Sequence, residues 1–159
     1  MLTILIKSVL SLVAYVVIII VFRLAYHFLI AKRHLPRQSM NICGPEGITV
    51  DVSGLFYDGH REESLKLTRD LSTIFFSVGF FIFGIISLFL RGMNTPMIVV
   101  LFFNFSYYLG ASARTATEDA KDYLSSFMGE LTRLEAIGSI LLAVLFSAGT
   151  TALIVLLLG

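Results

Sequence analysis

The sequence predicts an all-α membrane protein with four transmembrane helices, a small cytoplasmic β-hairpin insert, and cytoplasmic helical extensions (a stalk) continuous with the membrane helices. The first observation is composition: 57% of the 159 residues are hydrophobic and only 14% are charged, about half the charged share of a soluble domain. A soluble domain of this size cannot bury so much apolar surface, so we expect the chain in lipid. The second is that apolar residues form four long runs. The third is that most polar residues lie in two connections, after runs one and three.

The first apolar run, residues 2–30, exceeds the roughly 20 residues of one plain span, and it contains Lys7 and Arg23. Two registers fit. In one, residues 2–22 span the bilayer and Arg23 lies at the interface. In the other, residues 9–30 span it and Arg23 is an intramembrane charge with a candidate functional role, unless it snorkels. We favour the first, because a charge at the centre of a membrane helix costs about 2.5–3.5 kcal/mol on insertion scales.

Beyond the first run, the helix is expected to continue out of the bilayer until Pro36 stops it. A cleaved signal peptide is the rival interpretation of this segment. It is disfavoured because the apolar core is too long, the start lacks a basic cluster, and no small-x-small site follows Ile20.

The second and third runs predict an antiparallel helical hairpin. The second, residues 71–90, is followed by Arg91 and Gly92, and Gly92 is the expected helix C-cap. The third opens with Asn94 or Thr95 as N-cap and Pro96 in the first turn. The link is only about four residues long, which favours helices that lie side by side.

The polar insert between the first two runs predicts a β-hairpin. Residues 48–53, "ITVDVS", alternate strictly between apolar and polar side chains, which is strand periodicity. Residues 38–43 are the expected partner, joined through the "GPEG" turn. An isolated hairpin is marginal in water, so it needs subunit copies or a partner. Cys43 is the single cysteine; it is best explained as a small buried hydrophobe, with a bridge between subunits as the alternative.

Each polar helix outside the bilayer is expected to be continuous with the membrane helix that follows it. "HREESLKLTRDL" has no breaker before the second run and should lead straight into it. In the other connection, Thr117 is a plausible N-cap for a helix with an apolar stripe at helical spacing. No proline interrupts the chain from there to Leu158. We therefore predict one helix of about 40 residues and about 60 Å, whose stripe packs on subunit copies or on the outer half of the first segment.

These features divide the chain into five parts. They are the first membrane helix with its extension (1–36), the hairpin-and-helix insert (37–70), the membrane hairpin of helices two and three (71–110), the amphipathic stalk (111–136) and the fourth membrane helix (137–159).

Lysine and arginine counts predict the orientation. Nine basic residues lie in the two long connections: Lys32, Arg33, Arg37, Arg61, Lys66, Arg69, Arg114, Lys121 and Arg133. Two lie on the opposite side, Lys7 and Arg91. The positive-inside rule then places both connections in the cytoplasm and both termini outside, in a multi-pass membrane protein.

The fourth run carries the candidate pore-lining residues. Ser139, Ala143, Ser147 and Thr151 recur every four residues on one helix face, where small hydroxyl-bearing side chains suit a narrow aqueous path. Helix packing is the competing and more common use of such a face. Asn104 in the third run is a further pore candidate, although a buried amide more often links neighbouring helices.

A basic group in the insert provides the candidate regulatory site. His60, Arg61, Lys66 and Arg69 lie near glycine-rich turns, and such a group suits the phosphates of a nucleotide or oligonucleotide. Neighbouring acidic residues dilute the charge, and contact with anionic lipid is the competing explanation.

The sequence gives little support for an enzymatic activity or a metal-binding site. The sequence has no HExxH, GxSxG, Walker A or Rossmann pattern. Its three histidines, His27, His34 and His60, lack partners at metal-ligand spacing. With a net charge of +1, a general affinity for nucleic acid is not expected. We predict no enzyme, no cofactor and no metal site.

These observations favour a homo-oligomeric channel gated from the cytoplasmic side, with a tetramer as the preferred assembly. Its partners would be the bilayer, further copies of itself, and a cytoplasmic nucleotide or oligonucleotide ligand or regulatory protein. The alternative is a non-conducting accessory or scaffold subunit of a larger membrane complex. A small membrane enzyme or carrier is disfavoured because the required residues are missing.

In layout, the chain resembles small four-helix membrane effector channels of bacterial anti-phage defence systems. The resemblance rests on the "CGPEGITVDVSG" insert, the "TEDAKDYLSSFMGELTRLEA" stalk and the "GSILLAVLFSAGTTALIV" span. It implies a pore in a bacterial inner membrane that opens on infection and depolarises that membrane, with the insert as sensor and the fourth helix as conduit.

Overall fold

The computed structural model describes residues 1–31, 41–43, 49–51 and 59–158; the side chains of residues 41–43, 49–51 and 59–64 are outside the description. Five helices make up the fold: α1 (Leu2–Leu29), α2 (Gly59–Arg91), α3 (Thr95–Thr115), α4 (Glu118–Glu130) and α5 (Arg133–Leu153), the last extended by a π-turn, η2 (Ile154–Leu158). Four of them are long and apolar enough to cross a membrane. The four predicted membrane segments are therefore confirmed, and the chain is a multi-pass membrane protein.

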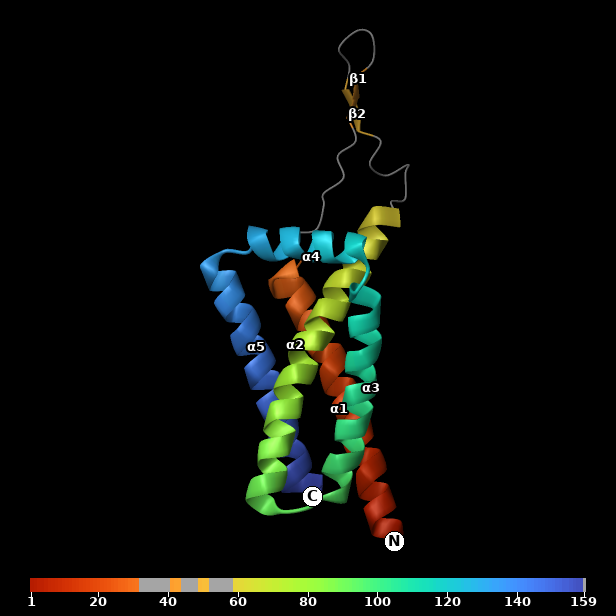
Figure 1. The fold of residues 1–159 in the computed structure, drawn as a ribbon, viewed down its shortest axis with the longest axis vertical. Coiled ribbons are helices and arrows are strands. Elements are labelled where there is room, and N and C mark those ends of the chain that lie inside the picture. Colours follow the sequence, from red (N-terminus) through yellow and green to blue (C-terminus); the bar gives the residue numbers. More distant parts are fainter. Residues whose placement is uncertain (32–40, 44–48, 52–58, 159) are drawn as a thin grey trace.

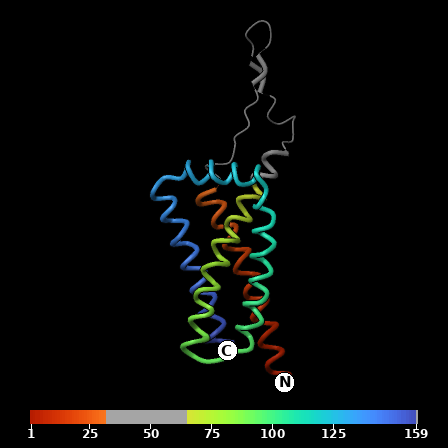
Figure 2. Tube along the Cα trace, in the orientation of Figure 1, coloured from red at the N-terminus to blue at the C-terminus, as the bar shows by residue number. Residues whose placement is uncertain are grey.

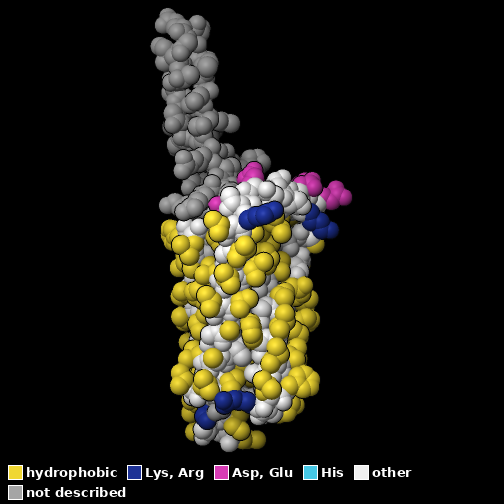
Figure 3. Space-filling model, turned by 90° about the vertical axis from the view of Figure 1, so that its left-hand side faces the viewer, with side chains coloured by type: hydrophobic (Ala, Val, Ile, Leu, Met, Phe, Trp, Pro, Cys, Tyr) yellow, Lys and Arg dark blue, Asp and Glu magenta, His cyan; other side chains and the backbone are white. Residues whose placement is uncertain are grey.

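The four long helices form an up-and-down bundle, with both termini at one end and α4 lying across the other (Figure 1). In this bundle α2 contacts both α3 and α5, and α1 packs against α3. Charged side chains gather at the two ends, and a broad apolar belt separates them (Figure 3). The 21 residues of α3 extend for about 32 Å at 1.5 Å per residue, which matches a hydrocarbon core of about 30 Å.

The insert contains two three-residue strands, β1 (Asn41–Cys43) and β2 (Thr49–Asp51), paired antiparallel with Ile42 opposite Val50. The turn and the outer ends of the predicted hairpin lie outside the described residues, and so does the Cys43 side chain. The hairpin as a packed unit therefore stays a prediction.

The predicted extension of the first helix is wrong. The α-helix ends at Leu29, and Ile30 departs from helical geometry with φ −125° and ψ −59°. Ile30 and Ala31 are buried in the same apolar cluster as Leu124 and Phe127 of α4. The α-helix therefore ends at Leu29, and residues 32–36 of the predicted extension lie outside the described residues.

Local signals at the other helix ends are confirmed. The helix before the second span is continuous with it, since α2 runs for 33 residues without interruption. Gly92 adopts φ +85°, and its N–H donates to the carbonyl of Leu88 at 2.9 Å. Asn94 is the N-cap of α3, accepting from the N–H of Met97, and Pro96 lies in the first turn. The helix continues to Thr115, beyond the predicted end near residue 110.

The predicted 40-residue stalk is also wrong. The chain breaks after α4, where Leu131 and Thr132 are extended with ψ of 130° and 162°. Thr132 then caps α5, its hydroxyl accepting from the N–H of Glu135 at 3.3 Å. The trace in Figure 2 shows α4 turned across the bundle and not along it. Its predicted N-cap, Thr117, is confirmed.

The stripe on α4 explains this turn. Ala120, Leu124 and Phe127 are buried, and Leu124 and Phe127 join the core cluster of the same chain. Lying flat lets α4 bury its apolar side on the bundle end, which a helix projecting into water does not achieve. The stripe is thus covered by its own chain.

Candidate functional sites

The predicted pore-lining face of α5 lies at a helix contact inside the bundle. Ser139, Ala143, Ser147 and Thr151 are all buried within the single chain. The contact with α2 is close: a Cβ added at Gly79 would lie 2.7 Å from the Ser147 Oγ and 3.7 Å from the Ala143 carbonyl oxygen. Small residues on both helices therefore let α2 and α5 approach closely.

The hydroxyl groups on this face are satisfied by their own helix. Ser139 donates to the carbonyl of Glu135 at 2.8 Å, and Ser147 donates to that of Ala143 at 2.6 Å. Thr151 donates to the carbonyl of Ser147 at 2.9 Å. With these bonds the hydroxyls need no water or ion, so burial against α2 costs little. Pore lining by the face stays a prediction.

Asn104 connects three helices at the centre of the bundle. Its side chain is 1% exposed. The amide nitrogen donates to the Ser77 carbonyl of α2 at 3.0 Å, and the amide oxygen accepts from the Tyr15 hydroxyl of α1. Asn104 therefore links neighbouring helices, which was the alternative to its assignment as a pore-lining residue.

Arg23 also reaches across helices. Its Nε donates to the Thr73 hydroxyl of α2 at 2.9 Å, and its guanidinium carbon lies 5.7 Å from the ring centroid of Tyr107 on α3. Thr73 follows Asp70 by one helical turn, and Asp70 pairs with Arg114 in the last turn of α3. The Arg23 partner Thr73 is thus one helical turn from the Asp70–Arg114 pair, which marks the boundary of the apolar belt at the α4 end. The choice between the two registers of the first segment stays a prediction.

An ion pair joins α2 to α3 at this boundary. Arg114 donates through two nitrogens to the two carboxylate oxygens of Asp70, each at 3.0 Å, and the Asp70 side chain is 2% exposed. Sequence reasoning missed the pair, treating Asp70 as a diluting charge. The predicted helical hairpin could have indicated the pair. Asp70 and Arg114 are almost equally far along the chain from Gly92 and Met93 in the turn, so they lie opposite each other.

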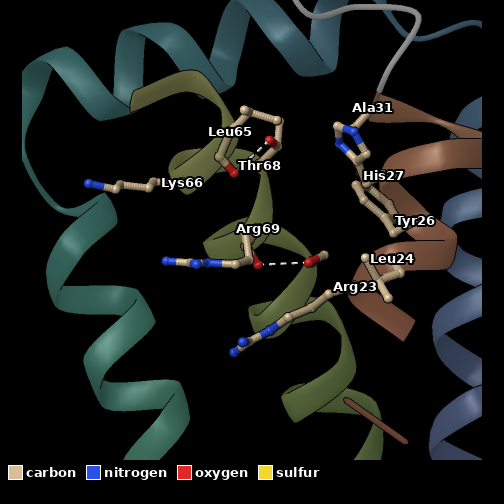
Figure 4. A pocket seen from close by; sticks show the side chains of 10 residues that line it. Arg23, Leu24, Tyr26, His27, Ala31, Leu65, Lys66, Thr68 and Arg69 are labelled. Carbon is tan, nitrogen blue, oxygen red and sulfur yellow. Dashed lines mark hydrogen bonds between the residues drawn. The ribbon is translucent and has the colours of Figure 1, made fainter. Parts of the chain in front are cut away.

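A basic pocket lies between α1 and α2 at the α4 end. Its volume is about 320 Å³, and its lining includes Arg23, Lys66 and Arg69 with the apolar Leu24 and Leu65. Figure 4 shows the three basic side chains extending toward the same side of α2. The structure thus brings Lys66 and Arg69 of the predicted regulatory group together with Arg23. The side chains of His60 and Arg61, the other two members, lie outside the described residues.

No family model, curated protein or solved structure matches this chain.

Proposed function

We propose that this chain is a membrane-embedded accessory or scaffold subunit that does not conduct by itself. In this role, the four-helix bundle holds the polar connection between α1 and α2 at the membrane surface, where partner proteins of a larger complex bind it. The observation that carries the proposal is that the predicted pore face, Ser139, Ala143, Ser147 and Thr151, is buried within the single chain, with Ser147 against Gly79 of α2.

Packing of the bundle axis supports the proposal. Tyr15 of α1 lies 5.2 Å from Phe80 of α2 between ring centroids, and Phe22 lies 5.4 Å from both Phe76 and Phe146. These rings connect α1, α2 and α5 along the line where a path through a single chain would run. Filling that line with close-packed aromatic side chains favours a stable anchor over a conduit.

A homo-oligomeric channel gated from the cytoplasmic side is the second candidate. It is favoured by the continuity of α2, which extends unbroken from Gly59 into the belt and contacts α5 directly. Force applied to the polar connection would move α2, and separation of α2 from α5 would uncover the Ser147 face. In that case the chain would be a bacterial inner-membrane effector with both termini outside, which assembles as an oligomer and depolarises the membrane.

Thiol accessibility distinguishes the two candidates. We would place Ser147→Cys in a Cys43→Ser background, reconstitute the full chain in liposomes, and apply a water-soluble thiol reagent. The scaffold predicts protection at position 147, whereas Ser125→Cys on the exposed surface of α4 reacts as the positive control. Reaction at position 147 would favour the channel.

Planar-bilayer recording of the same proteins supplies the second measurement. The scaffold predicts no single-channel steps, either from the intact chain or after deletion of residues 41–58, provided that the protein still assembles. Discrete steps that the reagent blocks in Ser147→Cys, but not in Ser125→Cys, would overturn the scaffold proposal and establish the channel.

A further inference from the structure

The basic pocket between α1 and α2 lies at the level where lipid phosphates are found. Arg69, one of its lining residues, directly precedes Asp70, which pairs with the last turn of α3. Since α3 spans about the thickness of the hydrocarbon core, this level is the edge of the apolar belt. Headgroup phosphates and the phosphates of soluble ligands can both reach such a position.

The positive charge of the pocket is not neutralised by Asp70, the acidic residue next to Arg69. Asp70 is buried and engaged by both nitrogens of Arg114. Arg69 is exposed, and within the part of the chain that the structure describes its guanidinium makes no hydrogen bond or ion pair with a side chain. Arg23 is fixed in place by Thr73. No carboxylate is found among the described lining residues.

The remaining lining is apolar, with Leu24, Ala31 and Leu65 beside the cations. A ligand that suits both parts has a phosphate group on an apolar stem, because guanidinium groups form paired hydrogen bonds to phosphate oxygens. The cavity of about 320 Å³ is at the lower end of the range for small-molecule pockets. It holds a headgroup and the beginning of its stem.

The geometry points to a binding site for a phosphate group in this pocket, with Arg69 and Arg23 as its anionic-ligand contacts. The phosphate is supplied either by an anionic lipid of the leaflet at the α4 end or by a soluble phosphorylated molecule. This assignment goes beyond the scaffold role and does not depend on whether the chain conducts.

Ligand titration of the purified full chain in detergent tests the site. The probes are phosphatidic acid, inorganic pyrophosphate and, as the zwitterionic reference, phosphatidylcholine, with binding followed by native mass spectrometry and by the shift in Tm. Arg69→Gln is the main variant, because the Arg69 guanidinium makes no hydrogen bond or ion pair with a side chain in the described part of the chain. Arg133→Gln is the matched control, since Arg133 is an exposed arginine at the same end of the bundle, outside the pocket.

We expect Arg69→Gln to weaken phosphate binding about tenfold or more, as the loss of a hydrogen-bonded charge implies, and Arg133→Gln to leave it unchanged. Arg23→Gln should weaken binding similarly, provided that its circular dichroism spectrum is that of the unmodified protein. Saturable phosphatidic acid binding with this pattern identifies the lipid as the source, and the same pattern with pyrophosphate identifies a soluble ligand. Equal behaviour of Arg69→Gln and Arg133→Gln toward both probes would overturn the site.

Discussion

Three side-chain contacts connect the helices of the bundle. The hydroxyl of Tyr15 donates to Asn104, Asn104 donates to the Ser77 carbonyl, and Arg23 donates to Thr73. An unpaired polar group in an apolar surrounding costs several kcal/mol. These contacts therefore fix the rotation of α1, α2 and α3 relative to one another. Removing one partner leaves the other polar group unpaired, at the free-energy cost just given.

Asn104→Leu is expected to destabilise the bundle by about 1–2 kcal/mol, the upper range for interhelical hydrogen bonds in membranes. The reason is that leucine fills a similar volume but leaves the Tyr15 hydroxyl without its acceptor. Reversible unfolding in mixed micelles, followed by circular dichroism, measures the change. Ser106→Ala on the same helix is the control, because its exposed hydroxyl donates only to the carbonyl of Phe102. An equal loss in both variants would contradict a specific role for Asn104.

At the scale of elements, local chemistry determined most helix ends, and packing determined the rest. Gly92, Asn94 and Thr117 were predictable because each acts through its own turn of backbone. The end of α1 was not, because Ile30 is part of the buried core cluster, and burial depends on the whole fold. Thr132 was overlooked, although Thr132 and Glu135 have the spacing of a capping box.

The same division holds for the candidate sites. Spacing by four predicted that Ser139, Ala143, Ser147 and Thr151 share a face, and they do. What that face contacts depends on α2, and Gly79 gave no sequence signal that it lies opposite Ser147. The basic pocket needs α1 and α2 side by side, so Arg23 could not be joined to Arg69 from the sequence.

Gly79→Ala is expected to destabilise the α2–α5 contact by about 1–3 kcal/mol, as overpacking does, because its Cβ would meet the Ser147 Oγ at 2.7 Å. The double variant Gly79→Ala with Ser147→Gly should recover part of the loss by removing the opposing atom. Unfolding in mixed micelles measures both. Gly138→Ala on α5 is the matched control, since no atom lies within 4 Å of its added Cβ. A loss in Gly138→Ala as large as in Gly79→Ala, or no recovery in the double variant, would show that the contact is loose.

At the scale of the whole molecule, the bundle separates two unequal charged ends. Lys7 and Arg91 flank a pocket at the end with the termini. The opposite end carries α4 (Figure 1), and the basic pocket lies there as well. Among the described residues, the α4 end carries five of the basic residues that were counted from the sequence: Lys66, Arg69, Arg114, Lys121 and Arg133. Because the basic residues are unequally divided between the two ends, the positive-inside rule orients the four helices together.

We expect the α4 end to face the cytoplasm, because basic residues near membrane helices resist translocation. Two single-cysteine variants in a Cys43→Ser background test this in intact bacterial cells: Met93→Cys in the α2–α3 turn, where Met93 is 86% exposed, and Ser125→Cys on α4. A membrane-impermeant thiol reagent should label position 93 in intact cells and position 125 only after lysis. Labelling of position 125 alone in intact cells would reverse the orientation. The pocket of Arg23 and Arg69 would then open to the outer leaflet, and a cytoplasmic phosphorylated ligand would be excluded as its occupant.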